Sequence, residues 1–356
     1  MFTRRIKKSI VSSLILACLV FVAISLYSDL PGMLQALARF QWSYLPLILA
    51  CTLFNYLGRY VKWNYYLHKL AIKLPWQRSL LIFLSGLSMA ITPGKVGEVL
   101  KSYLLKDTTG VPISYTAPII VAERLTDGIA MLGLAATGLI LYRFGWEILL
   151  FLLLTGILGI ILVQQRRLVA YCLQRIATLP GGKKIVPLIQ RFYESTYVLL
   201  QWRPLLLAIL IGFISWSGEC LALYFVFRGL GSGVSSILLI KSTFILAVSS
   251  LIGSASGLPG GLGTADGSVL GLTRLLVSPS ASFGGAATLL IRFSTLWFGL
   301  GIGVFALVGY RLLTRNDEDT TKPDQERQAL WIDIPTDPDA FSHKQSVITS
   351  TGDTFL

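Results

Sequence analysis

Eight charged side chains fall inside long apolar segments of this sequence, where charges are rare. They are Lys95, Glu98, Glu123, Arg124, Asp127, Glu219, Asp266 and Arg292. A charge at membrane depth costs several kcal/mol on insertion scales, so such a residue marks a functional site and is expected to have a partner. Glu123, Arg124 and Asp127 are spaced so that one helical face can carry a small ion-pair network.

Two similar segments break apolar stretches, and each is followed by one of the arginines. They are Pro93-Gly94-Lys95-Val96-Gly97 and Pro259-Gly260-Gly261-Leu262-Gly263. Irregular backbone at membrane depth is tolerated where it is buried in protein or lines a wet cavity. Broken helices at corresponding places in two halves of a chain point to a transporter's binding site.

These residue types suit the binding of an anion, and a phosphate in particular. A half-helix that starts after Pro93-Gly94 offers free backbone N–H groups and a positive dipole end. The guanidinium groups of Arg124 and Arg292 can each contact two phosphate oxygens. The predicted substrate-binding residues are Pro93, Gly94, Lys95, Gly97, Glu98, Lys101, Glu123, Arg124, Asp127, Pro259, Gly260, Gly261, Gly263, Asp266 and Arg292. The alternative is that these charges only neutralise each other and fix hairpin packing.

Catalytic machinery is not apparent in the sequence. It contains no G-x-S-x-G elbow, no G-x-x-x-x-G-K-[ST] loop and only two histidines, while its four cysteines are scattered singly. We therefore predict no catalytic residues, no metal site and no cofactor. Glu219 has no oppositely charged neighbour in sequence, and a structural role is as plausible for it as a functional one.

The composition requires a membrane protein. Hydrophobic residues make up 54% of the 356 residues and charged residues 14%, which is outside the usual range of soluble domains. Apolar runs of about the twenty residues needed to cross a bilayer predict spans at residues 10–27, 43–61, 117–141, 146–163, 204–227 and 283–310.

Two further apolar regions are predicted to be re-entrant hairpins, at about residues 79–106 and 237–277, because each is split by a Pro-Gly segment. This topology places 20 Lys and Arg on the cytoplasmic side and five outside, as the positive-inside rule requires. Residues 58–78 are counted as a cytoplasmic loop. The predicted fold is all-α, with six transmembrane helices and two hairpins in two repeats of inverted topology.

The chain divides into three predicted regions. Residues 1–142 form the first repeat, residues 143–315 the second, and residues 316–356 an acidic, disordered cytoplasmic tail. Residues 164–203 alternate basic and apolar groups at helical spacing, which predicts two amphipathic helices on the cytoplasmic leaflet. Their basic side chains would attract anionic lipid, although simple positive-inside bias explains the same charges.

Three motifs in this order resemble the lysylphosphatidylglycerol synthase transmembrane-region family, also called flippase-like domain proteins. They are Thr92-Pro93-Gly94-Lys95-Val96-Gly97-Glu98-Val99-Leu100-Lys101, Glu123-Arg124-Leu125-Thr126-Asp127 and Pro259-Gly260-Gly261-Leu262-Gly263. The family commonly has Arg where this chain has Lys95 and Lys101, and a Glu where Asp266 stands. The resemblance covers about residues 5–315 and implies a membrane domain that moves a modified lipid between leaflets, here without the synthetase that accompanies it in some members.

We therefore expect a lipid translocase for a phosphate-bearing, aminoacylated or glycosylated lipid. The alternatives are an integral-membrane transferase, with Glu98, Glu123 or Asp266 as general base, and a non-transporting partner of a synthase or glycosyltransferase. Expected partners are membrane lipids, either anionic or modified phospholipids or lipid-linked glycans, and a separate lipid synthase or glycosyltransferase, but no nucleic acid. The expected location is the inner (cytoplasmic) membrane, with several spans and both termini cytoplasmic.

Overall fold

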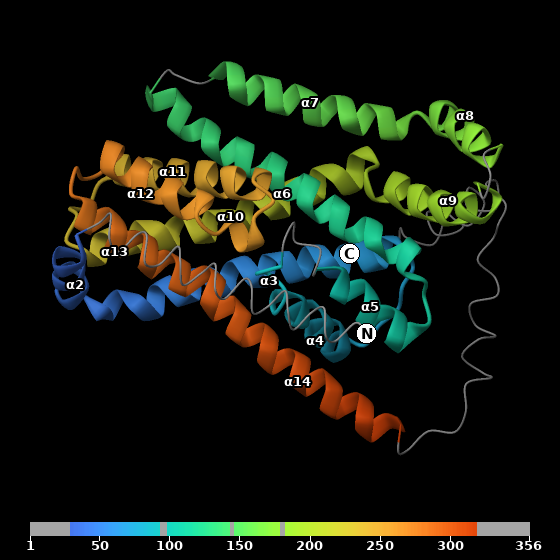
Figure 1. The fold of residues 1–356 in the computed structure, drawn as a ribbon, viewed down its shortest axis with the longest axis horizontal. Helices are drawn as coiled ribbons and strands as arrows, with labels where there is room; N and C mark the ends of the chain where they lie inside the picture. The colour runs from blue at the N-terminus through green and yellow to red at the C-terminus, as the bar shows by residue number, and fades with distance from the viewer. Residues whose placement is uncertain (1–28, 93–97, 143–145, 179–181, 319–356) are drawn as a thin grey trace, which may run out of the picture.

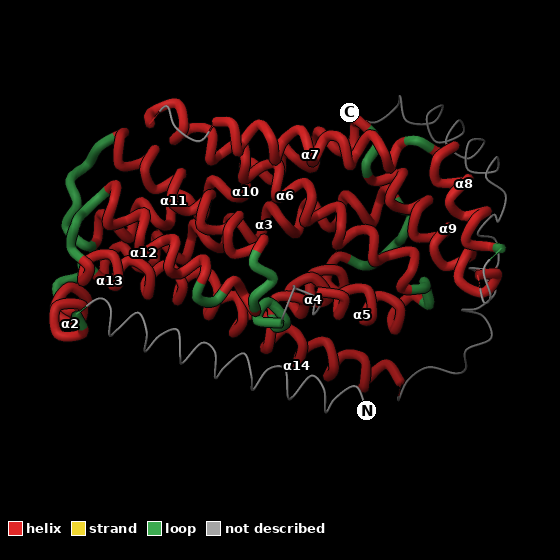
Figure 2. The backbone as a smooth tube through the Cα atoms, turned by 45° about the horizontal axis from the view of Figure 1, so that its top comes forward, coloured by secondary structure: helices red, strands yellow, loops and turns green. Residues whose placement is uncertain are grey.

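The computed structural model describes residues 29–92, 98–142, 146–178 and 182–318, which form helices joined by short loops (Figures 1 and 2). No strand occurs in these ranges. The first part contains α2 Leu30–Ala38, η1 Trp42–Tyr44, α3 Leu45–Lys69, α4 Trp76–Leu87, α5 Val99–Thr109 and α6 Ile113–Tyr142. The middle contains α7 Trp146–Gln164, α8 Arg166–Ala177 and α9 Gly182–Leu199. The last part contains α10 Trp202–Gly229, α11 Ser236–Ala255, η3 Pro259–Gly261, α12 Thr264–Leu276, α13 Ala281–Arg292, η4 Phe293–Trp297 and α14 Phe298–Glu318.

The all-helical class and the presence of several long apolar helices are confirmed. By length and composition, three described helices could cross a membrane, namely Trp202–Gly229, Ser236–Ala255 and Ala281–Thr314. Counting each of two bent helix pairs as one span raises the number to five. The predicted spans at 117–141 and 146–163 correspond to α6 and α7, while the predicted first span, 10–27, lies outside the described residues.

The two predicted hairpins differ in length. Helices α4 and α5 have 12 and 11 residues, and at 1.5 Å per residue each reaches only about half of a 30 Å hydrocarbon core. They pack against each other, as expected of a re-entrant hairpin. Helix α11 packs against α12 in the same way, but with 20 residues it is long and apolar enough for a full span.

Helices far apart in sequence cross at the centre of the molecule. Helix α3 packs against α10, while α4 packs against α14 and α6 against α11. Glycines permit these close approaches, as small residues do in membrane bundles. A Cβ at Gly303 of α14 would lie 2.2 Å from the backbone nitrogen of Ser88, and one at Gly138 of α6 would lie 2.4 Å from the Phe244 ring. Each hairpin therefore packs on the last long helix of the opposite half.

The middle helices lie at the edge of this bundle (Figure 1). Helix α7 exposes most of its apolar side chains, including Phe151 and Leu154. Helices α8 and α9 occupy the region where two amphipathic helices were predicted, and α8 is entirely unburied. The end of α9 differs, because Val198 and Leu199 are buried and α9 packs against α6.

Candidate functional site

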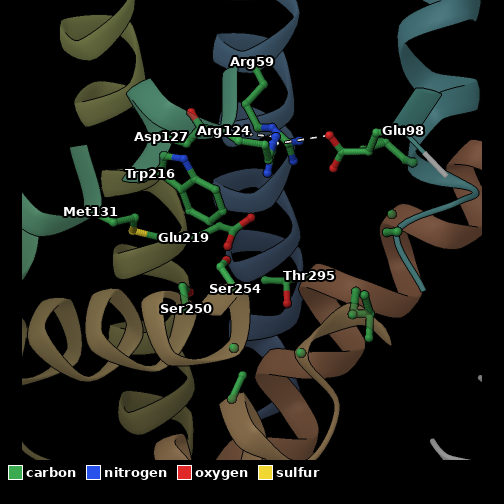
Figure 3. A pocket seen from close by; sticks show the side chains of 18 of the residues that line it. Arg59, Glu98, Arg124, Asp127, Met131, Trp216, Glu219, Ser250, Ser254 and Thr295 are labelled. Atoms are coloured by element: carbon green, nitrogen blue, oxygen red, sulfur yellow. Dashed lines mark ion pairs between the residues drawn. The ribbon is translucent and has the colours of Figure 1, made fainter. Parts of the chain in front are cut away.

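A cavity of about 570 Å³ lies between the two hairpins and is lined by residues of both halves. This volume falls within the range of small-molecule sites, which are mainly apolar with a few placed polar groups. Its walls come from α3, α4, the start of α5, α6, α10, α11, α12 and the α13–η4–α14 helix. Figure 3 shows the polar side chains that converge on it. The charged groups among the lining residues are Arg59, Glu98, Lys101, Arg124, Asp127, Glu219 and Arg292.

Arg124 stands at the centre of a charge network that joins α6 to the start of α5 and to α3. Its Nε lies 3.3 Å from Glu98 Oε2 and its Nη2 lies 3.2 Å from Asp127 Oδ2 (Figure 3). Neither nitrogen has a hydrogen-bond partner among the described residues, so charge rather than hydrogen bonding holds these contacts. A quarter of the Arg124 side chain remains exposed, and it borders the cavity.

Asp127 is also paired with a lysine on α3. Lys62 Nζ lies 2.5 Å from Asp127 Oδ1 and 3.4 Å from Thr126 Oγ1, and only 1% of the Lys62 side chain is exposed. Gly212 of α10 leaves room for this ammonium group, since a Cβ there would lie 2.9 Å from Lys62 Nζ. Lys62 does not line the cavity, so it pairs with Asp127 on the side of the carboxylate away from the cavity.

Lys101 is fixed inside the protein by a carboxylate and two aromatic rings. Its Nζ donates to Glu123 Oε2 and lies 4.8 Å from the centre of the Trp63 ring and 5.6 Å from that of Phe83. The absence of a side chain at Gly86 makes space for its methylene groups. Cation–π contacts of this kind stabilise a desolvated ammonium, so Lys101 anchors α5 to α6 and α3.

Arg292 fastens the turn of the second hairpin. Its Nε donates to Asp266, and its Nη1 and Nη2 donate to the carbonyl oxygens of Gly260 and Gly261 at 3.3 and 3.2 Å. Asp266 also accepts the backbone N–H of Gly263 at 2.8 Å, which caps α12. The glycines are needed here because all three have positive φ, between 60° and 84°.

The helix that carries Arg292 changes to a π-helix directly after it, over Phe293–Trp297. Such π-helical turns are often found at functional sites. The carbonyl of Thr295 in this turn accepts a 2.6 Å hydrogen bond from the Tyr56 hydroxyl of α3. Gly299 makes the approach possible, because a Cβ there would lie 2.3 Å from that hydroxyl.

A neighbouring wall of the cavity has a different chemistry. It is formed by α10 and α11 and presents the Trp216 ring, the Glu219 carboxylate and the hydroxyls of Ser249, Ser250 and Ser254 (Figure 3). We call these five residues the α10–α11 wall. Among the described residues, no group of three or more His, Cys, Asp and Glu side chains could hold a metal ion.

The structure brings most of the predicted residues to one region but gives them different positions. Glu98, Lys101, Arg124, Asp127, Gly260, Gly261 and Arg292 line the cavity. Glu123 and Asp266 lie behind it as partners of Lys101 and Arg292, and Pro259 and Gly263 belong to the adjoining turn. Pro93, Gly94, Lys95 and Gly97 lie outside the described residues. The expected pairing within the Glu123–Asp127 segment is confirmed for Arg124 and Asp127.

Two cations of the site, Arg59 and Lys62, were missed because residues 58–78 were counted as a cytoplasmic loop, although the span itself was predicted to reach residue 61. The structure continues α3 to Lys69, which brings Arg59 to the cavity and Lys62 to Asp127. The available signal was the six aromatic and apolar residues among positions 60–67, interrupted by Lys62 and Asn64, which a surface loop does not need. Trp216 and the serines of α11 carried no local signal.

Comparison with known proteins gives a consistent result. A family model described as the lysylphosphatidylglycerol synthase TM region matches residues 10–303. A UPF0104 membrane protein of Methanocaldococcus jannaschii is 24% identical over 239 residues, which is 64% of this chain and 94% of that protein. A UPF0104 membrane protein of Methanothermobacter thermautotrophicus is 27% identical over 241 residues, which is 59% of this chain and 68% of that protein.

Proposed function

The chain belongs to the lysylphosphatidylglycerol synthase TM region family, and we propose that it is a lipid translocase that moves a phosphate-bearing lipid between the leaflets of the membrane. The head group would enter the cavity between the two hairpins, while the acyl chains stay in the bilayer. The family and the apolar helices make the chain a multi-pass membrane protein. The location in an inner membrane and the cytoplasmic termini remain part of the proposal.

The observation that carries this proposal is the state of Arg124. Arg292 uses Nε, Nη1 and Nη2 on Asp266 and the hairpin turn. Arg124 is instead held by charge, is partly exposed and borders the cavity. An arginine in that state can exchange a carboxylate contact for a phosphate oxygen and gain aligned hydrogen bonds. We therefore assign phosphate contact to Arg124, and to Arg292 the task of holding the second hairpin in place.

The packing of each hairpin on the opposite half supports an alternating-access movement. The contacts of α4 with α14 and of α11 with α6 are those expected when two inverted repeats are related by a two-fold axis in the membrane plane. Rocking of one repeat against the other would then open the cavity to each leaflet in turn. The topology of six spans and two hairpins is part of the same proposal.

The test is leaflet exchange of fluorescent lipids in proteoliposomes, with phosphatidylglycerol, aminoacyl, glycosyl and polyprenyl-phosphate head groups compared. Arg124→Lys keeps the charge but loses the planar fork. We expect it to reduce exchange about tenfold, since a hydrogen bond to a charged group contributes about 1.5–3 kcal/mol, while the melting temperature changes little. Arg292→Lys is the matched control, because this arginine holds the hairpin turn. Its main effect should be a lower melting temperature, larger than that of Arg124→Lys.

Two results would contradict the proposal. One is an unchanged exchange rate in folded Arg124→Lys protein. The other is the absence of exchange for every head group by the wild-type protein, combined with the loss of one modified lipid species from cells that lack the gene. That combination would favour a membrane transferase instead.

A further inference from the structure

The α10–α11 wall borders the same cavity as the cations of α3 and α6, with Arg59 lying over its Trp216 ring, and the function proposed above leaves it without a role. Trp216 and Glu219 are three residues apart on α10, and Ser250 and Ser254 are one turn apart on α11. All four line the cavity and cluster around one part of it (Figure 3). The wall therefore combines an aromatic ring, one carboxylate and several hydroxyls in a small area.

Two buried polar groups of this wall have no hydrogen-bond partner among the described residues, namely Trp216 Nε1 and Ser249 Oγ. A buried polar group without a partner costs about 1–3 kcal/mol, and native proteins contain few of them. Because both residues line the cavity, a bound ligand is in a position to supply the missing partners.

The chemistry of the missing partners distinguishes between head groups. The indole N–H is a donor only, so it needs an acceptor, and an ammonium group has none. The Arg59 guanidinium already lies over the Trp216 ring, 5.9 Å from its centre, so a second cation at this ring would be repelled. A hydroxyl both donates and accepts and carries no charge. Several hydroxyls on one ligand can together accept from the indole N–H, donate to the Glu219 carboxylate and exchange hydrogen bonds with the serines.

Building on the proposed translocation of a phosphate-bearing lipid, we propose that the part of the head group beyond the phosphate is polyhydroxylated, a sugar or polyol, and that it binds the α10–α11 wall. The Trp216 ring packs against the apolar face of the sugar or polyol. Glu219 and the serines of α11 bind its hydroxyls, while the phosphate contacts Arg124 at the adjoining part of the cavity.

The test measures which phospholipid the purified full-length protein retains, by native mass spectrometry from equimolar mixtures with identical acyl chains. The series is phosphatidic acid, phosphatidylglycerol and phosphatidylinositol, in which the number of head-group hydroxyls rises, with phosphatidylethanolamine as the ammonium lipid. We expect occupancy to rise along the series and phosphatidylethanolamine to be disfavoured. Phosphatidylinositol should exceed phosphatidic acid by about fivefold for each hydrogen bond gained.

Two variants connect this preference to the wall. Trp216→Phe keeps a ring but removes the N–H, and Ser249→Ala removes one unpaired hydroxyl, so each should lower the ratio of phosphatidylinositol to phosphatidic acid about fivefold. Ser85→Ala is the matched control, because the Ser85 hydroxyl is also buried without a partner but does not line the cavity. Retention of phosphatidic acid in each variant shows that the protein is folded.

The outcomes separate this inference from the proposed function. Three results would overturn the polyhydroxyl assignment alone, provided that phosphatidic acid is retained and that Arg124→Lys weakens its retention. They are equal retention of phosphatidylinositol and phosphatidic acid by the wild type, a preference of the wild type for phosphatidylethanolamine, and a ratio of phosphatidylinositol to phosphatidic acid that neither variant changes. If the wild type retains none of the lipids, or Arg124→Lys has no effect on any of them, the phosphate site fails and both proposals fall.

Discussion

Replacement of the two members of the Lys62–Asp127 pair should have unequal effects on stability, although both side chains are almost fully buried. Lys62→Met leaves the Asp127 carboxylate paired with Arg124 at 3.2 Å, and the nearby Arg59 also stabilises its negative charge. Asp127→Leu leaves the Lys62 ammonium beside the Thr126 hydroxyl, 3.4 Å away, with no carboxylate in salt-bridge contact among the described residues. It also removes one of the two carboxylates beside Arg124. The carboxylate is therefore the more important partner.

The magnitudes follow from these contacts. Removing one partner of a buried ion pair typically costs about 3–5 kcal/mol, because the other charge stays buried. We expect Asp127→Leu to reach that range and Lys62→Met to cost about 2 kcal/mol, since Arg124 still compensates Asp127. The double variant buries neither charge of the pair, and replacing a whole buried pair by apolar residues is often close to neutral. Its cost should therefore be below that of Asp127→Leu alone.

The assay is thermal unfolding of the purified protein in one detergent, with all variants measured at the same protein and lipid concentration. At about 2 °C per kcal/mol for a protein of this size, the apparent melting temperature should fall by about 4 °C for Lys62→Met and by 6–10 °C for Asp127→Leu. Equal losses for the two single variants, or a double variant that loses the sum of both, would refute the reasoning that Arg124 shares Asp127 with Lys62.

Two further predictions concern helix contacts. Gly303→Ala should lower the melting temperature by several degrees, because its Cβ would lie 2.2 Å from the Ser88 nitrogen. Gly301→Ala is the control and should be neutral, since position 301 has open space around it. Equal melting temperatures of the two variants in thermal unfolding would exclude close α4–α14 packing. Tyr56→Phe removes the 2.6 Å hydrogen bond to the Thr295 carbonyl and should cost about 1 kcal/mol, measured as a fall of about 2 °C, and an unchanged melting temperature would show that the bond contributes nothing.

The sequence was sufficient to predict the features that depend on local periodicity and composition. Apolar runs located α6, α7 and α10 to within a few residues, and the spacing of Arg124 and Asp127 anticipated their contact. The cross-helix partners were not predictable in this way. Lys62 and Asp127 are 65 residues apart, and their pairing depends on how α3 and α6 cross, which no local pattern specifies.

The π-helical turn after Arg292 was missed for a related reason. A π-helix has no distinct residue pattern, and it forms where tertiary contacts favour one extra residue per turn. The Tyr56 hydroxyl supplies such a contact at the Thr295 carbonyl. The Pro259-Gly260 segment indicated where the chain turns between α11 and α12, but the use of Arg292 to bind the carbonyls of Gly260 and Gly261 depends on the three-dimensional position of α13.

The charges around the cavity bear on the phosphate contact that we propose for Arg124. Among the described residues that line or back the cavity, the five cations are matched by five carboxylates. The cations are Arg59, Lys62, Lys101, Arg124 and Arg292, and the carboxylates are Glu98, Glu123, Asp127, Glu219 and Asp266. Because the charges of these described residues balance, we expect an entering phosphate to displace an existing carboxylate contact rather than add to it.

The ion pairs of Lys101, Arg292 and Arg124 differ in how many interactions are lost when the cation leaves its carboxylate. Lys101 would have to leave Glu123 and two aromatic rings, and Arg292 would have to leave Asp266 and two carbonyl oxygens. At Arg124 neither Nε nor Nη2 forfeits a formed hydrogen bond, and Asp127 keeps Lys62 when Arg124 turns away. Under the proposed function, Lys62 would act on the substrate indirectly, because it stabilises the carboxylate that Arg124 would release.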